Sequence, residues 1–392
     1  MRPNREPNSC ANALSGSDPA ERPHADEVEV SVFGPGYGEC VVLHLTNNQW
    51  VIIDSCADAD SAQPAALKYL SSLAVDLATD VRLILATHYH DDHITGIGEL
   101  LEQCTAARFA CSMALNSADW TKLTEIYRGY LVTGGSGVDE IRRVMRELKR
   151  RAEKREVVAP IFCIAGRTLG EPFLTAPAVL ACLSPSDAAV VAMHTRIREK
   201  LLPRARRRRL AVPSLESNDG SVVLAIRVGS ASALLGADLE ERNRPGLGWQ
   251  AVLDSHVAGA ERYDGLKVPH HGSSTGYHAD VWNRLIGSNG WTVVTPYNRQ
   301  KQPIPTKTDC ERIRRMTERS FITSPPGWSR FRHPSPAVQK TAEEATVKIS
   351  PEQPRYGHVR LRKSATTAGD WRIDCFGHAT LLAAIANRSP EL

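Results

Sequence analysis

Three histidines and two aspartates lie together in the segment Thr87-His-Tyr-His-Asp-Asp-His93, directly after a short apolar run ending at Ala86. The run is nearly continuous in apolar residues, which is typical of a buried strand. His88 and His90 are two positions apart, so their side chains project to the same side if the strand end is extended. Neutral imidazoles and carboxylates are ligands that a zinc-like divalent cation prefers. The segment therefore predicts a metal site at the end of a strand.

The four potential ligands of this segment are His88, His90, Asp92 and His93, which are enough to hold two adjacent cations. Their spacing resembles, position for position, the His-x-His-x-Asp-His signature of the metallo-β-lactamase superfamily. The resemblance implies the α/β fold of that superfamily, a four-layer αββα sandwich, with two divalent metal ions, Zn²⁺ or Mn²⁺, as cofactor.

Three further segments are similar to later parts of the family pattern, so the resemblance spans about residues 28–300. Asp54, which closes an apolar strand, resembles the acidic residue that supports the metal loop. Asp238, at the end of Ala233-Leu-Leu-Gly-Ala-Asp, resembles the aspartate that bridges the two metals. The segment Lys267-Val-Pro-His-His-Gly-Ser273 resembles the loop that supplies the last histidine. The resemblance implies His271 as a metal ligand and His270 as a substrate-facing group that protonates the leaving group.

One branch of the superfamily matches these segments better than the others. Asn218-Asp-Gly-Ser-Val-Val-Leu, followed by the Asp238 strand and the Lys267 segment, resembles the hydrolase domain of the competence DNA-uptake channel (ComEC-like). No run in this chain reaches the roughly 20 apolar residues of a membrane span, so it resembles a free-standing relative of that domain. Phosphorylcholine esterases of the superfamily carry a similar His-His-Gly pattern.

The chain departs from the family where a third histidine usually completes the first metal site. Between His93 and Asp238 the only histidine is His194, inside a charged, helical stretch. Asn218 stands where the ligand is expected, and it is interpreted either as a ligand through its amide oxygen or as a turn residue. A weakly held first metal widens the range of metals from Zn²⁺ to Mn²⁺.

The resemblance implies a hydrolytic mechanism in which a hydroxide bridging two cations attacks phosphorus or a carbonyl carbon. Asp92 and His270 are the expected catalytic residues beside the metals. Lys267 is a further candidate, for contact with an anionic oxygen, although an ordinary strand lysine explains it equally well. Ser273 and Ser274 offer hydroxyl and backbone N–H groups to phosphate oxygens.

The elements that position these residues are expected to alternate between strands and helices in two blocks. Residues 1–26 are polar and rich in Pro, Ser and Asn, and we interpret them as a flexible leader. Residues 27–305 form the hydrolase domain, with a basic, partly helical insertion over about 110–216. Residues 306–392 form a C-terminal extension that ends in a β-hairpin, which either completes the sheet or binds a partner.

Composition limits the partners and the compartment. The formal net charge of +4 does not by itself indicate a nucleic-acid binder. Basic runs at 142–155 and 204–209 are interpreted as a solvated helix with a loop, or alternatively as an electropositive rim that attracts a polyanion. The nine cysteines lack any C-x-x-C spacing and suggest reduced thiols, so we expect a cytoplasmic protein without a membrane segment.

The motifs and the composition of the chain are compatible with three functions. The first is a metal-dependent phosphodiesterase, plausibly a nuclease acting on DNA or RNA. The second is a hydrolase of a small ester or thioester with the same metals. The third is a binding or regulatory module that lost catalysis, for which the missing third histidine is the only support. The oligomeric state is not indicated by the sequence.

Overall fold

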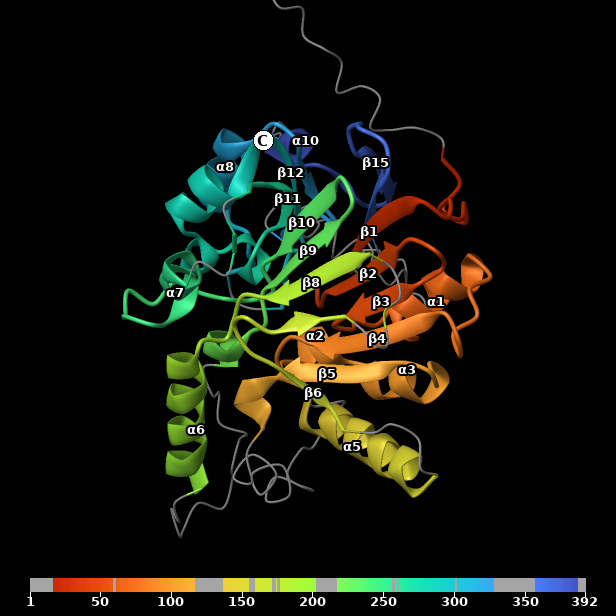
Figure 1. The fold of residues 1–392 in the computed structure, drawn as a ribbon. Helices are drawn as coiled ribbons and strands as arrows, with labels where there is room; N and C mark the ends of the chain where they lie inside the picture. The colour runs from red at the N-terminus through yellow and green to blue at the C-terminus, as the bar shows by residue number, and fades with distance from the viewer. Residues whose placement is uncertain are drawn as a thin grey trace, which may run out of the picture.

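Two large β-sheets stacked face to face form the centre of the computed structural model, and helices cover their outer faces (Figure 1). The structure describes residues 17–58, 61–116, 137–154, 159–170, 174, 177–201, 217–255, 258–259, 261–299, 302–327 and 357–386. This arrangement confirms the predicted α/β class and the four-layer αββα order.

The first sheet has eight strands in the order β15-β14-β1-β2-β3-β4-β5-β6. They are β1 (Glu27–Phe33), β2 (Cys40–Leu45), β3 (Trp50–Ile53), β4 (Val81–Ala86), β5 (Arg108–Ser112), β6 (Ile161–Cys163), β14 (Gly357–Ser364) and β15 (Arg372–Gly377).

The second sheet also has eight strands, in the order β16-β13-β12-β11-β10-β9-β8-β7. They are β7 (Thr168–Leu169), β8 (Ala178–Cys182), β9 (Leu224–Val228), β10 (Ala231–Leu235), β11 (Tyr263–Lys267), β12 (Ile286–Val294), β13 (Ser320–Ile322) and β16 (Thr380–Leu381).

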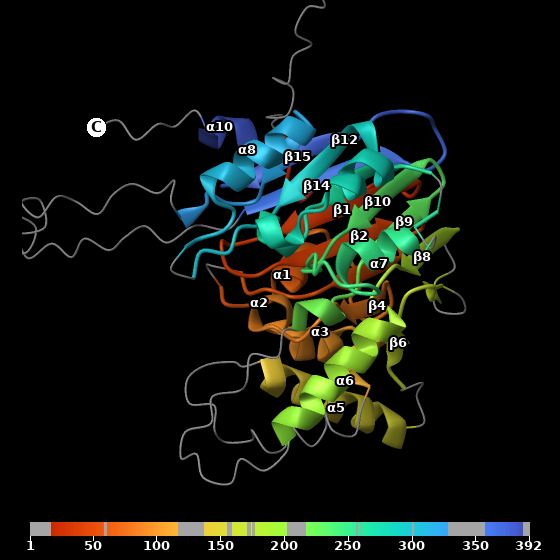
Figure 2. The same cartoon turned by 90° about the vertical axis from the view of Figure 1, so that its left-hand side faces the viewer.

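The described residues form α-helices and short helical turns. The α-helices are α1 (Ala65–Ser72), α2 (Asp91–Ile94), α3 (Ile97–Gln103), α5 (Gly137–Glu153), α6 (Asp187–Leu201), α7 (Gly248–Asp254), α8 (Lys307–Met316) and α10 (Leu382–Ala386). Short helical turns are η2 (Met113–Leu115), η3 (Ser217–Gly220), η4 (His270–Gly272), η5 (Ser274–Gly276) and η6 (Val281–Leu285). Figure 2 shows α5 and α6 together at the end of the molecule that carries β6.

Alternation of side chains along each strand builds three apolar layers. In β1, Val28, Val30 and Val32 all pack between the two sheets, because successive side chains of a strand point to opposite faces. Phe33, at the end of the same strand, packs instead with the layer under α1 and α3. A third layer lies between the second sheet and helices α7, α8 and α10.

The candidate site residues follow the carboxyl ends of parallel strands. β3, β4 and β5 are parallel neighbours in the first sheet, and β10, β11 and β12 are parallel neighbours in the second. Asp54 follows β3, and the histidine segment follows β4. Asp238 comes shortly after β10, and His271 comes shortly after β11. The ends of parallel strands meet at one edge of a sheet, which gathers chemistry from distant parts of the sequence.

The expected insertion over 110–216 is more closely built into the sandwich than the sequence indicated. β6 pairs with β5 in the first sheet, and β8 pairs with β9 in the second. Strands with so few residues and no long period-2 pattern give little signal in the sequence, which explains the difference. The basic run at 204–209 lies outside the described residues.

The C-terminal hairpin completes the first sheet. β14 and β15 are antiparallel, as expected, and β14 also pairs with β1 along its whole length. Because β13 and β16 belong to the second sheet, residues beyond 306 contribute to both sheets, and a boundary at 305/306 would divide the sandwich. Of the two expected roles, the structure thus shows sheet completion, and partner binding stays a prediction.

Residues 17–26, the described part of the expected leader, contact this hairpin. The buried Arg360 guanidinium donates hydrogen bonds to the carbonyl oxygens of Asp18 and Glu21, at 3.1 and 3.3 Å. It also pairs with the buried Asp374 carboxylate at 3.1 Å. The backbone before β1 thus satisfies a buried cation, which an apolar environment requires.

Two further expectations concern the compartment. All eight cysteines in the described part of the chain are free thiols. Among the described residues, every helix is too short or too polar to traverse a lipid bilayer.

His44, buried on β2, makes the stability of the fold depend on pH. Its Nδ1 lies 2.8 Å from the carbonyl oxygen of Glu27 and its Nε2 accepts the backbone N–H of Asn48, so the ring is neutral in the folded protein. Burial lowers the pKa of His44 to about 4. The unfolded chain, with an ordinary pKa near 6.5, binds more protons as the pH falls through this window.

We therefore expect His44 to remove about 2 kcal/mol of unfolding free energy between pH 7 and pH 5. The measurement is urea unfolding of the wild-type protein and of His44→Gln at both values. The wild-type protein should lose more stability than the variant, and identical losses in the two proteins would contradict the assignment.

Candidate metal centre

Asp54 fixes the orientation of the metal-binding segment. Its carboxylate is buried and accepts the backbone N–H and the hydroxyl of Thr87, both at 2.7 Å. It also accepts the Nδ1 proton of His93 at 2.7 Å. Burial raises the pKa of Asp54, although the contact with His93 opposes the shift. Burial alone would lower the pKa of His93, but the Asp238, Asp92 and Asp54 carboxylates raise it well above its ordinary value. Because Nδ1 is committed to Asp54, Nε2 is the nitrogen that would give up its proton to a cation.

Two more histidines are held in the same way. The Thr87 hydroxyl gives its proton to Asp54, so it accepts from Nδ1 of His88, at 2.9 Å. Nδ1 of His271 donates to the carbonyl oxygen of Thr295 at 2.9 Å. Burial lowers the pKa of His88 well below its ordinary value, which keeps this imidazole neutral. All three rings therefore anchor Nδ1 to the protein and leave Nε2 for the centre of the site.

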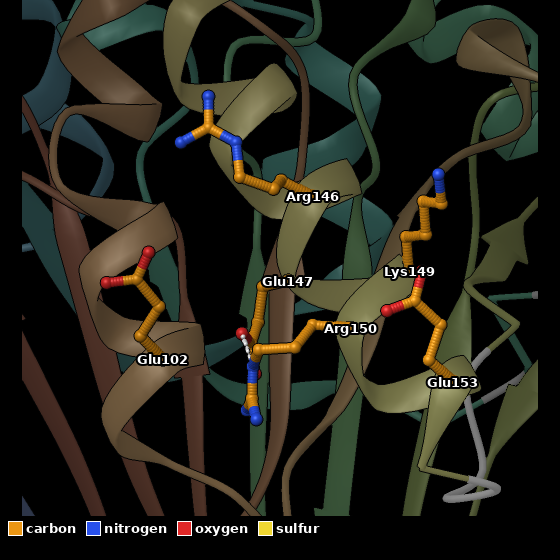
Figure 3. A pocket seen from close by; sticks show the side chains of 6 residues that line it. All are labelled: Glu102, Arg146, Glu147, Lys149, Arg150 and Glu153. Carbon is orange, nitrogen blue, oxygen red and sulfur yellow. Dashed lines mark hydrogen bonds and ion pairs between the residues drawn. The ribbon is translucent and has the colours of Figure 1, made fainter.

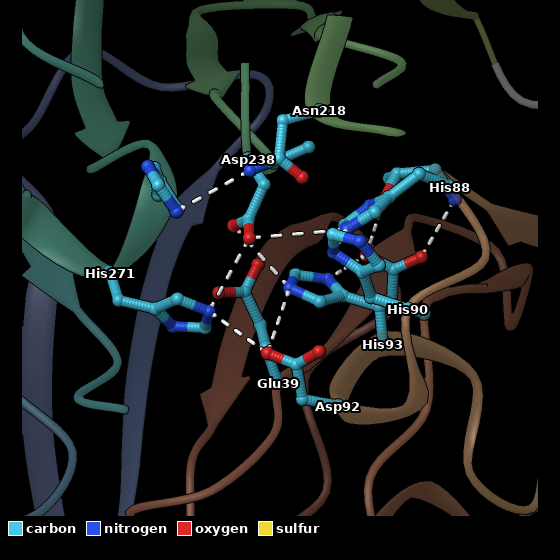
Figure 4. A network of polar contacts seen from close by, with 12 residues as sticks. Glu39, His88, His90, Asp92, His93, Asn218, Asp238 and His271 are labelled. Carbon is cyan, nitrogen blue, oxygen red and sulfur yellow. Dashed lines mark hydrogen bonds and ion pairs between the residues drawn. The ribbon is translucent and has the colours of Figure 1, made fainter. Parts of the chain in front are cut away.

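Two groups of candidate ligands share one aspartate (Figure 4). The first group contains His88, His90 and Asp238, and the second contains Asp92, His93, Asp238 and His271. Nε2 of His271 lies 3.1 Å from Asp92 and 3.4 Å from Asp238, and Nε2 of His93 lies 3.3 Å from Asp238. An aspartate common to both groups is the arrangement expected of a carboxylate that bridges two cations.

The donor set fits divalent cations. Nε2 of His93 and Oδ1 of Asp238 are buried and face each other at 3.3 Å, but neither forms a hydrogen bond within the described residues. Such atoms are costly unless something satisfies them. Burial alone would lower the pKa of His271, but the Asp238 and Asp92 carboxylates raise it to about 9. Protons on the histidines thus balance the carboxylates, and cations would take their place as they bind.

Asn218 lies on η3 beside this centre. Its Nδ2 donates to Oε1 of Glu240 at 2.9 Å and lies 3.4 Å from Nε2 of His270. Its Oδ1 is buried and has no hydrogen-bond partner among the residues that the structure describes. Arg242 pairs with the other oxygen of Glu240 at 3.0 Å, which holds the carboxylate in place. His194, the alternative third histidine, lies on α6 and belongs to none of the candidate ligand groups in the described residues.

His270 lies beside the candidate metal centre, but the position of its proton differs from that expected of a donor to the leaving group. Its Nδ1 lies 3.1 Å from Oε1 of Glu240 and 2.8 Å from the hydroxyl of Thr275. Burial lowers the pKa of His270, so its ring is neutral and Nε2, which faces the amide of Asn218, presents a lone pair. This arrangement does not favour the predicted role as proton donor to a leaving group.

The two serines predicted to contact phosphate occupy the loop after His271. The Ser273 hydroxyl accepts the backbone N–H of Thr275 and caps η5, while Ser274 is exposed. Their contact with a phosphate group stays a prediction.

Lys267 does not lie where a substrate could reach it. The side chain is fully buried, forms an ion pair with Glu39 and donates to the carbonyl oxygen of Ala237. Glu39 also accepts the hydroxyl of Thr295, the residue whose carbonyl oxygen orients His271. The structure therefore does not favour the predicted contact between Lys267 and an anionic oxygen of a substrate, because the ammonium group pairs with Glu39 inside the fold.

Several polar residues around the site were not predicted from the sequence. Glu39 directly precedes the apolar strand β2, and a charge beside such a run is a weak signal of a buried partner. Glu240 lies two positions after Asp238, and an acidic residue just beyond a strand is ordinarily interpreted as exposed, so the sequence gives no sign of its contact with Asn218. Tyr37 and Tyr297 lie in loops without a motif, and their proximity depends on packing alone.

The basic helix α5 is largely neutralised by its neighbours. Arg143 pairs with Glu102, and Arg150 pairs with Glu147. The buried Arg151 donates to the backbone carbonyl oxygen of Ala107. A pocket on this helix is lined by three carboxylates and three cations: Glu102, Arg146, Glu147, Lys149, Arg150 and Glu153 (Figure 3). Balanced charge of this kind gives little attraction for a polyanion.

Comparison with known proteins agrees with the fold and with the histidine segment. Residues 33–140, which include Asp54 and all four ligands of that segment, match the family model of the metallo-beta-lactamase superfamily. This part of the chain is similar to that superfamily, and the two stacked sheets with their covering helices match the metallo-beta-lactamase fold. A search of the curated protein sequences finds no match.

Several solved structures are similar to this chain. The metallo-beta-lactamase fold protein YhfI from Bacillus subtilis is 14% identical, with a TM-score of 0.32, covering 62% of this chain and 70% of that one. MEM-A1, a subclass B3 metallo-beta-lactamase isolated from a soil metagenome library, is 15% identical, with a TM-score of 0.33, covering 64% and 79%. Rm3 metallo-beta-lactamase is 15% identical, with a TM-score of 0.33, covering 69% and 85%. Sequence identities and TM-scores this low carry no information about the substrate of this chain.

Proposed function

We propose that this protein is a metal-dependent hydrolase that cleaves phosphodiesters. The observation that carries the proposal is the pair of ligand groups that share Asp238, into which three anchored histidines direct Nε2. Two divalent cations held there would supply a water of lowered pKa and would neutralise charge that develops on a phosphoryl group.

Each ligand position has a role that this chain's own residues define. Asp92, His93 and His271 would hold one cation, His88 and His90 would hold the other, and Asp238 would serve both. Asp54, Thr87 and Thr295 position the histidines from behind, as supporting groups do in metal sites.

Asn218 is the proposed third protein ligand of the first cation. Its Nδ2 is committed to Glu240, so Oδ1, which has no hydrogen-bond partner in the described part of the chain, is the atom left to bind a cation. An amide oxygen is a harder donor than imidazole, so the proposed metals are Zn²⁺ and Mn²⁺. A nucleic-acid substrate is a further proposal, supported by the ComEC-like motifs rather than by the charge of α5.

The test is hydrolysis of bis(p-nitrophenyl) phosphate by the purified protein after chelation and after addition of Zn²⁺ or Mn²⁺. We expect turnover that requires added metal and is lost in Asp92→Ala, since Asp92 contacts His271 and belongs to the second ligand group. A parallel assay with p-nitrophenyl acetate distinguishes an esterase. Metal binding without hydrolysis of either compound would contradict the enzyme assignment and favour a binding module.

A further inference from the structure

Two tyrosines and one arginine connect the candidate metal centre to the protein surface. The ring of Tyr297 lies 5.4 Å from the ring of His271, centroid to centroid, and the ring of Tyr37 lies 5.5 Å from that of Tyr297. The guanidinium of Arg299 lies 3.4 Å from the centroid of the Tyr37 ring. Three short contacts thus lead from a candidate metal ligand to an exposed cation.

The backbone holds these side chains together from two separate loops. Tyr37 lies in the loop between β1 and β2, and the backbone N–H of Asn298 donates to the carbonyl oxygen of Gly36 in that loop at 2.9 Å. Gly38 has φ +96°, and a Cβ there would approach the carbonyl oxygen of Asp92 at 3.0 Å. Only glycine combines this conformation with such close approach, so the Tyr37 loop is fitted against the metal-binding segment.

The chemistry offered by this cluster is that of an anion site. Neither tyrosine hydroxyl forms a hydrogen bond within the described residues, and Arg299 has no ion pair among them. By contrast, Arg242 and Arg312, which also flank the site loops, pair with Glu240 and Asp309. A guanidinium and two phenolic O–H groups are all hydrogen-bond donors, and a guanidinium binds the oxygens of phosphate in a fork.

We propose that Arg299, Tyr37 and Tyr297 form a subsite that binds the anionic phosphoryl oxygens of the substrate next to the metal centre. This inference rests on the proposed function and deepens it, because it assigns the preference for an anionic phosphodiester over a neutral carboxylic ester to three residues. Arg299 supplies the charge, and the stacked Tyr37 ring limits the directions in which its guanidinium points.

The test compares Arg299→Gln with Arg299→Lys and with the control Arg82→Gln. Arg82 is a half-buried arginine near the start of β4, at the opposite end of the strand from the metal-binding segment. All variants are loaded with Zn²⁺ or Mn²⁺ and their metal content is measured. We expect Arg299→Gln to raise KM for bis(p-nitrophenyl) phosphate about tenfold with unchanged metal content, which corresponds to one charge-assisted contact of about 1.4 kcal/mol.

KM for p-nitrophenyl acetate should stay the same in Arg299→Gln, Arg299→Lys should be intermediate, and Arg82→Gln should match the wild type. Calorimetric titration of each metal-loaded protein with inorganic phosphate gives a readout that does not need turnover, and affinity should fall about tenfold in Arg299→Gln. Absence of phosphodiester hydrolysis in the wild-type protein contradicts the proposed function. Equal phosphate affinity in wild type and Arg299→Gln overturns the subsite.

Discussion

Asp238→Asn should reduce metal content from two ions per chain to one or none and should reduce phosphodiester turnover at least a thousandfold. Asp238 is the one residue shared by the two groups of proposed ligands, so its loss weakens both positions at once. Charge stabilisation by a bound cation contributes several kcal/mol to a transition state, and each 1.36 kcal/mol is a factor of ten in rate. Asparagine keeps the shape of the side chain, which separates this effect from a packing defect.

The measurement combines metal analysis of the dialysed protein with kcat for bis(p-nitrophenyl) phosphate. Asp139→Asn on α5 is the matched control, because Asp139 is exposed and lies outside the candidate ligand groups of the described residues. The metal-free variant should be less stable than the metal-free wild type, since Asp238 lies 3.3 Å from Nε2 of His93 and 3.4 Å from Nε2 of His271, and these histidines lower its pKa well below the ordinary value. Retention of two tightly bound ions in Asp238→Asn would refute the bridging role.

Lys267→Met and Glu39→Gln should each destabilise the fold by about 3–5 kcal/mol. Both side chains are buried, and removing one partner of a buried ion pair leaves the other without compensation. The double variant Glu39→Gln/Lys267→Met should be considerably more stable than the sum of the single losses predicts, because no isolated charge remains.

Urea unfolding in the presence of a chelator measures these values without a contribution from bound metal. The coupling between the two positions is obtained from the double-mutant cycle. If Lys267→Met unfolded like the wild-type protein and changed only KM for a phosphodiester, the lysine would contact substrate after all, as the sequence first suggested.

The sequence by itself determined the parts of the site that are close along the chain. His88, His90, Asp92 and His93 lie in one segment after a buried strand, and alternation along that strand predicts their common direction. The resemblance to the superfamily implied roles for Asp54 and Asp238 at the ends of apolar strands, and the structure places both in groups with those histidines. Local periodicity also predicted the principal strands and the C-terminal hairpin, because it depends only on neighbouring residues.

Only the tertiary structure decided which distant polar groups are partners. Glu39 and Lys267 are far apart in the sequence, and neither residue's surroundings predict that they meet in the interior. The same holds for the Glu240 contact that orients Asn218, and for the loops that bring Tyr37, Tyr297 and Arg299 together. These contacts depend on how two sheets stack and where their loops meet, which is set by the packing of the whole core rather than by any local pattern.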